Sequence, residues 1–212
     1  MKSLIINLFI LIFNYIIDKA DQIKKDSITS LDEVIIKSNT ILGSKFVAKN
    51  RTGAAYYLSI EELAKFNYTD INRALNKISG INVYEEDGFG LRPNISIRGT
   101  SPERSSKIAI MEDGVLISPA PYSASSAYYF PSVARMHAVE VLKGSSQIQY
   151  GPYTTGGAIN FVSTEIPDSF KGKVVSSYGS FNTGQLHSTF GNQTKNFGYM
   201  LEYLNYNSNG FK

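Results

Sequence analysis

Apolar and polar positions recur with two different periods along the 212 residues of the chain. Between residues 71 and 78, apolar side chains fall at i, i+3, i+4 and i+7 and a glycine follows two residues later, which predicts an amphipathic helix with a glycine C-cap. Ser59 and Glu62 have the spacing of a capping box and predict a shorter helix before it. Over residues 81–162 the apolar runs are short, β-branched and separated by glycine or proline, which predicts strands. We therefore expect one small α+β domain over residues 51–167.

The glycine-rich part of this domain is its most distinctive stretch. Two predicted strands, residues 139–143 and 158–162, flank a connection that contains Gly156 and Gly157 side by side. Adjacent glycines allow a neighbouring backbone to approach closely, because they carry no side chain. Glycine-rich turns can also bind phosphate, but neither the G-x-G-x-x-G nor the G-x-x-x-x-G-K-[ST] spacing occurs, so we interpret the connection as structural.

After residue 167 the pattern changes to strands, at residues 173–180, 185–191 and 197–206. In the third run, one face carries Phe197, Tyr199, Leu201 and Tyr203. Alternation with aromatic residues on one face and polar residues on the other, over about ten residues, is typical of a transmembrane β-barrel strand. A one-sided antiparallel sheet in a soluble protein has the same pattern. Three strands cannot close a barrel, so in the first interpretation residues 168–212 begin an incomplete barrel.

The N-terminal residues have the pattern of a leader. Lys2 precedes an apolar run over residues 4–17. This length suits the hydrophobic region of a signal peptide better than a membrane span, which needs about 20 apolar residues. A buried helix or an uncleaved anchor is the alternative. We predict a signal peptide over residues 1–20, followed by a polar lead-in over residues 21–50.

Composition excludes several classes of protein. Hydrophobic residues make up 42% of the chain, which is enough for a folded core and excludes a disordered chain. The formal net charge is only +3 and no run of five basic residues occurs, so we expect no nucleic-acid partner. The chain has no cysteine and two histidines, and no nucleophile elbow or closely spaced histidine–acid set. We therefore expect no metal site, no cofactor and no enzymatic activity.

Four motifs, in order, resemble those of the plug domain of TonB-dependent outer-membrane receptors. They are ISIRG at residues 95–99, MEDGV at 111–115, VEVLKG at 139–144, and YG followed by GGAIN within 150–160. The resemblance covers about residues 31–212, and the segment from 90 to 131 is most similar to the ferric citrate receptors. It implies an α+β plug, with a small mixed sheet and short helices, followed by the first antiparallel strands of a truncated transmembrane β-barrel.

The resemblance also implies that the lead-in at residues 21–50 is periplasmic and that it binds a partner there. A TonB box is an extended peptide that adds as a strand to the sheet of the TonB-type energy-transducing protein. The residues that resemble it are Asp32, Glu33, Val34, Ile35 and Ile36. We expect no separate signalling domain between the leader and this box. The receptor is then expected in the outer membrane of a Gram-negative bacterium, with its plug facing the periplasm.

Three loops are implied to face the ligand, at residues 88–94, 100–107 and 118–129. The expected ligand contacts in them are Arg92, Asn94, Arg104, Tyr122, Ser123, Tyr128 and Tyr129. A ferric chelate such as ferric citrate is anionic, and the guanidinium group of arginine matches carboxylates at two points. Iron is then part of the cargo and no cofactor of the chain. A receptor for another cargo, such as cobalamin or a saccharide, and a secreted soluble binding domain remain the alternatives.

A separate expectation concerns three charged residues, Arg98, Glu140 and Lys143. Each lies on a predicted strand, where a charged side chain needs a partner because burial of an unpaired ion is costly. Glu140 can pair with one of the two cations inside the plug. The resemblance implies that Arg98 and Lys143 face glutamates on the inner wall of the barrel. We therefore expect these three residues to anchor the plug to the barrel.

Overall fold

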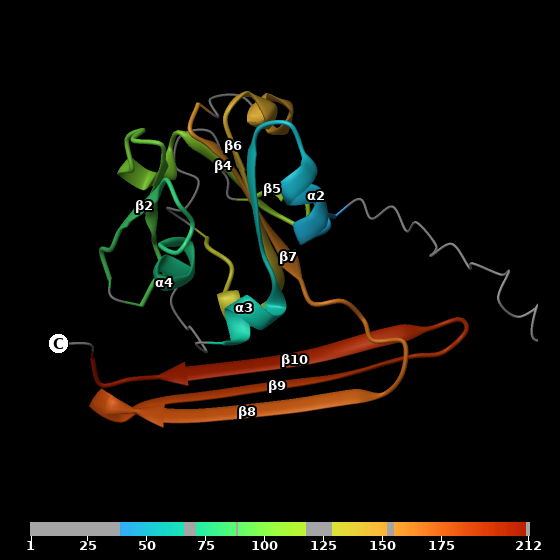
Figure 1. The fold of residues 1–212 in the computed structure, drawn as a ribbon. Helices are drawn as coiled ribbons and strands as arrows, with labels where there is room; N and C mark the ends of the chain where they lie inside the picture. Colours follow the sequence, from blue (N-terminus) through green and yellow to red (C-terminus); the bar gives the residue numbers. More distant parts are fainter. Residues whose placement is uncertain (1–38, 66–70, 88, 118–128, 152–154, 211–212) are drawn as a thin grey trace, which may run out of the picture. The chain divides into compact units, whose positions relative to one another are not determined.

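A computed structural model describes five ranges of the chain: residues 39–65, 71–87, 89–117, 129–151 and 155–210 (Figure 1). The predicted signal peptide, the predicted TonB box and the ligand candidates Tyr122, Ser123 and Tyr128 lie outside these ranges. Contacts divide the chain into two units, residues 1–36 and residues 37–212. The fold below is that of the second unit.

A five-stranded mixed sheet forms the centre of the fold, with the strand order β1-β6-β7-β4-β5. β6 pairs antiparallel with β1 and β7, whereas β4 and β7 are parallel. The strands are β1 (Ala54–Leu58), β4 (Ile108–Glu112), β5 (Val115–Leu116), β6 (Met136–Lys143) and β7 (Gly157–Ser163). β6 and β7 contain the two strands predicted around the glycine-rich connection, and every residue of β6 except His137 is buried. The most distinctive stretch of the sequence is therefore the middle of the sheet.

One face of this sheet is covered by helices and a hairpin. The covering elements are α3 (Ile60–Ala64), α4 (Ile71–Leu75), β2 (Ile81–Tyr84) and β3 (Asn94–Ile97). Both predicted helices are confirmed. The backbone N–H of Ser59 donates to Glu62 Oε2 at 3.2 Å, as a capping box requires. The four apolar positions of the predicted second helix are almost fully buried, but α4 ends at Leu75, where a tighter turn begins with Ile78 N bonded to Leu75 O.

The other face of the sheet is covered by residues ahead of β1. Leu42 and Ala48 pack in one cluster with Ala109, Met111 and Leu142 from the sheet. Ala48 belongs to α2 (Lys45–Asn50), which the sequence does not predict. We call residues 39–43 the strap. The strap and α2 therefore pack on the central sheet, ahead of the predicted domain start at residue 51, and both faces of the sheet are buried.

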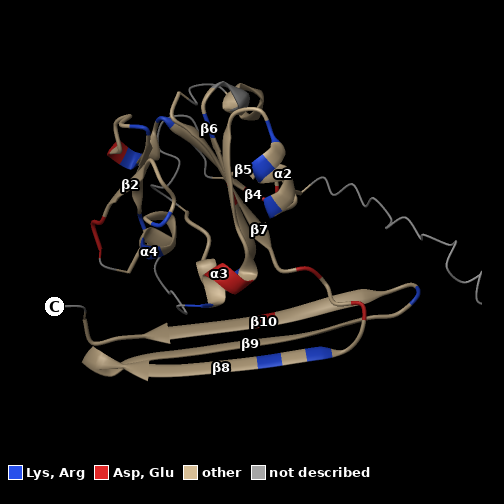
Figure 2. Ribbon diagram, in the orientation of Figure 1, with Lys and Arg blue, Asp and Glu red and all other residues tan. Residues whose placement is uncertain are grey.

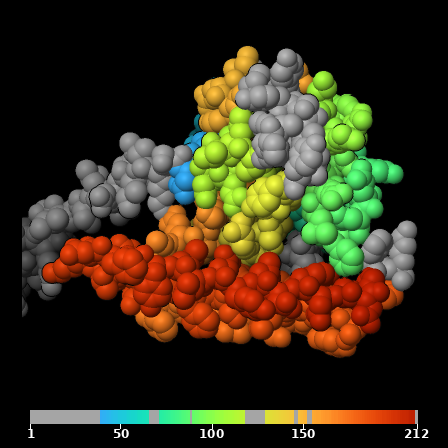
Figure 3. Space-filling model, turned by 180° about the vertical axis from the view of Figure 1, so that it is seen from behind, coloured from blue at the N-terminus to red at the C-terminus, as the bar shows by residue number. Residues whose placement is uncertain are grey.

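Residues 171–207 form a second, three-stranded antiparallel sheet with the order β10-β9-β8. Its strands are β8 (Lys171–Gly179), β9 (Thr183–Gln193) and β10 (Gly198–Asn207). β8 and β9 are longer than the predicted runs, and β10 has the predicted length with its bounds moved by one residue. Along β10, Tyr199, Leu201 and Tyr203 are exposed while Glu202 is partly covered and lies 2.6 Å from His187 Nε2 on β9. Figure 3 shows β10 in red as a continuous surface band. The predicted alternation of the two faces is thus present.

No helix in the part of the chain that the structure describes is long and apolar enough to span a membrane. The longest described α-helix, α2, has six residues. Regular structure in the described ranges is mostly strand, in agreement with the short apolar runs of the sequence.

Gly157 allows the closest backbone approach in the central sheet. A Cβ atom at this position would lie 2.4 Å from the carbonyl oxygen of Leu142 and 2.7 Å from Cδ1 of Ile97. Distances this short are clashes, so only glycine fits here without a shift of the backbone. The close approach predicted for the adjacent glycines is confirmed.

Gly157→Ala is expected to lower the free energy of unfolding by about 2–4 kcal/mol, because the added methyl group meets a backbone oxygen that cannot move away. Gly99→Ala is the control. No atom lies within 4 Å of the methyl group it adds, and only its left-handed backbone, with φ of 78°, opposes the change. The Gly99→Ala substitution should lower the free energy of unfolding by about 1 kcal/mol. Urea unfolding measures both, and equal losses would contradict the packing argument.

Candidate functional site

Asp87 organises the first of the three loops expected to face a ligand. Its carboxylate accepts hydrogen bonds from the backbone N–H groups of Phe89, Gly90 and Leu91 through Oδ1, at 2.8 to 3.3 Å. A fourth, from Arg92 N, reaches Oδ2 at 3.0 Å. The backbone thus wraps around a carboxylate, while the side chain of Arg92 is exposed.

Asn94 joins this loop to the second one. Its Nδ2 donates to Glu86 Oε1 at 2.7 Å, and its Oδ1 accepts from the backbone N–H of Arg104 at 2.8 Å. Asn94 is only 6% exposed, so a buried amide connects the two loops through these hydrogen bonds. Arg104 is exposed and lies in η1 (Glu103–Ser105), a short 3-10 turn that also carries an acid (Figure 2). The structure therefore places Arg92 and Arg104 on two loops that a buried amide holds together.

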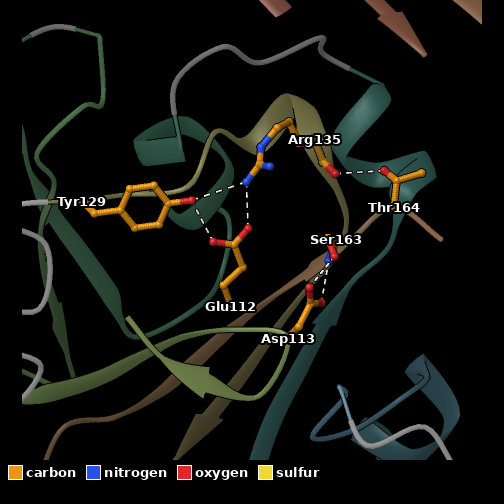
Figure 4. A network of polar contacts seen from close by, with 6 residues as sticks. All are labelled: Glu112, Asp113, Tyr129, Arg135, Ser163 and Thr164. Carbon is orange, nitrogen blue, oxygen red and sulfur yellow. Dashed lines mark hydrogen bonds and ion pairs between the residues drawn. The ribbon is translucent and has the colours of Figure 1, made fainter. Parts of the chain in front are cut away.

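Tyr129 belongs to a different cluster, shown in Figure 4. Its hydroxyl group donates to Glu112 Oε2 at 2.8 Å, and Arg135 Nη2 donates to Glu112 Oε1 at 2.7 Å. Burial, followed by the hydrogen bond to Glu112, raises the pKa of Tyr129, so the phenol keeps its proton at neutral pH. We call these three residues the brace. It fixes the chain on both sides of residues 118–128, which carry three of the ligand candidates.

The turn next to the brace is also held by side chains. Asp113 and Gly114 both have positive φ, 51° and 80°, as the predicted tight hairpin requires. The Asp113 carboxylate accepts hydrogen bonds from the backbone N–H of Ser163, at 2.9 Å, and from its hydroxyl group. The sequence does not single out Arg135, because nothing in its local pattern distinguishes it from an ordinary surface arginine.

Arg98 and Lys143 lie close together at one end of the central sheet. A Cβ atom on Gly144 would lie 3.1 Å from Arg98 Nη1, so the guanidinium group crosses the end of β6. Burial, followed by the charge of Arg98, lowers the pKa of Lys143, and Lys143 Nζ donates to the carbonyl oxygen of Ser79 at 2.5 Å. Within the described ranges, no acid forms an ion pair with either cation. Arg98 was expected on a strand, but it follows β3 with a left-handed φ of 55°.

Glu140 does not pair with these cations, so that prediction is wrong. Side chains alternate along a strand, and residues three apart on β6 therefore point to opposite faces. The Glu140 carboxylate is 0% exposed and accepts hydrogen bonds from three consecutive backbone N–H groups of the strap. They come from Ile41 at 2.6 Å, Leu42 at 3.0 Å and Gly43 at 2.6 Å. Glu140 is thus engaged inside the plug.

Comparison with known proteins decides the family. Residues 48–158, which are 111 of the 212 residues, match the TonB-dependent receptor plug domain. The chain belongs to this family. Its members are receptors, which confirms that the chain is not an enzyme. In the described ranges, no group of three or more histidine, cysteine, aspartate or glutamate side chains is placed to hold a metal ion.

Solved structures of TonB-dependent receptors share the fold. The ferric citrate transporter FecA, in its unliganded form, is 27% identical, with a TM-score of 0.68, over 81% of this chain and 28% of its own. The ferric enterobactin receptor PfeA of Pseudomonas aeruginosa is 20% identical, with a TM-score of 0.54, over 70% of this chain and 24% of its own. The ferric yersiniabactin uptake receptor FyuA of Yersinia pestis is 21% identical, with a TM-score of 0.55, over 70% and 23%.

The chain thus spans 23–28% of the length of these three receptors. The plug match and the likeness to FecA confirm the predicted fold class, an α+β plug followed by antiparallel strands. They also confirm the resemblance to TonB-dependent receptors of the ferric citrate type, which the motifs at residues 95–160 carry.

Lys143→Met is expected to leave the plug equally stable or to stabilise it by up to about 1 kcal/mol at pH 7, because the charge is buried beside a like charge. The lowered pKa means that the unfolded chain binds this proton more tightly, so wild-type stability rises with pH toward about 10.4. The advantage of Lys143→Met should therefore shrink between pH 7 and pH 10 in urea unfolding.

The control for this measurement is Lys49→Met, at an exposed position in α2. It should change stability by less than about 0.5 kcal/mol, equally at both pH values. A loss of more than about 1 kcal/mol for Lys143→Met at pH 7 would show that the contacts of this cation, including its hydrogen bond to Ser79, outweigh the cost of burying its charge. That result would contradict our description of the pair.

Proposed function

We propose that this chain belongs to an outer-membrane receptor that takes an iron chelate into the periplasm, with energy supplied by a TonB-type protein bound at residues 32–36. The plug-domain match carries this proposal. The likeness to receptors named for ferric citrate, ferric enterobactin and ferric yersiniabactin supports it, because all three cargoes are iron chelates. In this function iron is part of the cargo and is not a cofactor of the chain.

The proposed location is the outer membrane of a Gram-negative bacterium, with the plug facing the periplasm. The exposed side chains of Tyr199, Leu201 and Tyr203 on one face of β10 support it, because lipid-facing barrel strands carry apolar and aromatic residues on alternate positions. A signal peptide at residues 1–20 would direct the export that this location needs. The plug match favours this reading over a secreted soluble domain.

Ferric citrate is the cargo we favour. FecA is 27% identical to the chain, compared with 20% and 21% for the enterobactin and yersiniabactin receptors. Arg92 and Arg104 are exposed on the two loops joined by Asn94. Their guanidinium groups suit the carboxylates of citrate, which they can bind at two points. The nearby acid Asp87 is turned inward onto four backbone N–H groups and does not oppose an anion.

The cation pair of Arg98 and Lys143 has a proposed role in holding the plug inside the barrel. Two adjacent cations with no acid among the described residues call for an anion from elsewhere, and acids on the inner wall of a closed barrel would supply it. Glu140 is engaged with the strap and has no part in this contact. Ion pairs of this kind hold the plug while leaving it releasable.

The cargo is tested by calorimetry on a receptor that contains these residues and a closed barrel. Ferric citrate should bind, and iron-free citrate should bind at least about tenfold more weakly. Arg92→Gln and Arg104→Gln should each weaken ferric citrate binding by about tenfold, because each removes a charge-assisted contact of about 1.4 kcal/mol. Arg73→Gln, an exposed arginine of α4, is the control and should leave affinity unchanged. Binding of cobalamin or a saccharide in place of ferric citrate would reassign the cargo.

Val34→Pro tests the energy-coupling segment, which lies outside the described ranges. The substitution should abolish iron uptake into cells and leave ligand binding intact, because proline removes a backbone donor from the added strand and bends the peptide. Val34→Thr keeps both the N–H group and the β-branched shape, and should retain uptake. Uptake by the proline variant at the wild-type rate would refute the assignment of residues 32–36.

A further inference from the structure

The contact between the strap and the sheet depends on one buried carboxylate. Glu140 is 0% exposed, and the described residues offer it no cation. Its charge is met instead by the three strap N–H groups and by Asn160 Nδ2 at 2.9 Å. Consecutive backbone N–H groups that converge on one anion form an anion-binding nest. Burial of a carboxylate without such donors is costly, so Glu140 and the strap stabilise each other.

Asn160 ties this contact to the rest of the sheet. Its Nδ2 also donates to the carbonyl oxygen of Asn39 at 3.0 Å, at the start of the strap. Its Oδ1 accepts from the backbone N–H of Gly114 at 2.8 Å, in the turn next to the brace. Asn160 is itself 0% exposed. The strap is thus fastened to β6, to β7 and to the hairpin turn by two side chains.

The strap also covers the second core cluster. Leu42 is 5% exposed and packs in the cluster with Met111, Leu142 and Ala158, and each of these three sheet residues is 1% exposed or less. The cluster on this face is smaller than the one beneath α3 and α4. Removal of the strap would uncover apolar sheet residues and, at the same time, expose the Glu140 carboxylate to water.

The place of the strap in the chain gives this fastening a function. It begins three residues after residue 36, the last residue of the proposed TonB box, and precedes every strand of the central sheet. A pull on residues 32–36 therefore reaches the strap before it reaches the sheet. The load falls first on the hydrogen bonds of Asn39, Ile41, Leu42 and Gly43.

We propose that Glu140 and Asn160 are the positioning residues that couple the pulled segment to the plug. Release of the strap from them is the first step of opening, and it uncovers the second face of the central sheet. This inference rests on the proposed function, because it needs residues 32–36 to be the segment that is pulled. The strength of the Glu140 contact then sets the force at which the plug begins to open.

Glu140→Gln tests the fastening with little change in size. Glutamine replaces one acceptor oxygen by an NH₂ group, which faces strap donors and cannot accept from them. Amide hydrogen exchange at residues 41–43 should become at least about tenfold faster. Glu62→Gln is the matched control, because it makes the same change at an acid that pairs with the exposed Lys45. It should leave exchange at residues 41–43 unchanged.

Coupling is tested by pulling on a receptor with a closed barrel through a bound TonB domain at residues 32–36. The first rupture should occur at lower force in Glu140→Gln than in the wild type and in Glu62→Gln, with ferric citrate affinity unchanged. If Glu140→Gln fails to fold, Asn160→Ala is the second variant. It keeps the carboxylate with its three strap donors, and it should lower the first rupture force by a smaller amount.

Two results would overturn the inference. One is unchanged exchange at residues 41–43 in Glu140→Gln, which would show that the carboxylate does not fasten the strap. The other is faster exchange with an unchanged first rupture force, which would show that the strap is not the first part to yield. Failure of the TonB domain to bind residues 32–36 in the wild type would instead refute the proposed function, and the exchange result would still stand.

Discussion

The burial of the Glu140 carboxylate under backbone N–H groups is the constraint on which the plug depends. A charge at the centre of β6 requires donors on that face of the sheet, and the strap supplies three of them. With the strap in place, the second face of the sheet is covered and β6 is buried on both sides. Without it, the same strand would be a one-sided sheet strand with a hydrated acid.

Two acids and two arginines of the plug lie in different surroundings. The carboxylates of Asp87 and Glu140 each accept hydrogen bonds from successive backbone N–H groups. Arg92 and Arg104 remain exposed on loops whose backbone these contacts and Asn94 hold in place. A rigid backbone that presents guanidinium groups binds an anion at a smaller entropic cost than a loop that must first be ordered. The arrangement therefore suits an anionic chelate.

Much of the fold could be predicted because its signals are local. The four apolar positions of α4, the capping box at Ser59 and the Asp113–Gly114 turn each depend on contacts within a few residues. The alternation along β10 likewise reports which face is exposed. The partner of Glu140 could not be predicted, because it lies 97 to 99 residues away in a segment with no strand or helix signal. The period of two along β6 could have excluded a pairing with Lys143.

By itself, the sequence determined the order of the elements, the glycine corners and the family motifs, because each arises from neighbouring residues. Only the tertiary structure decided which charged groups face each other. It placed Arg98 beside Lys143, turned Asn94 and Glu140 inward and brought Arg92 and Arg104 onto joined loops. The physical reason is that a charge is compensated by whatever donor or acceptor lies nearest in space, and that distance has no local signal in the chain.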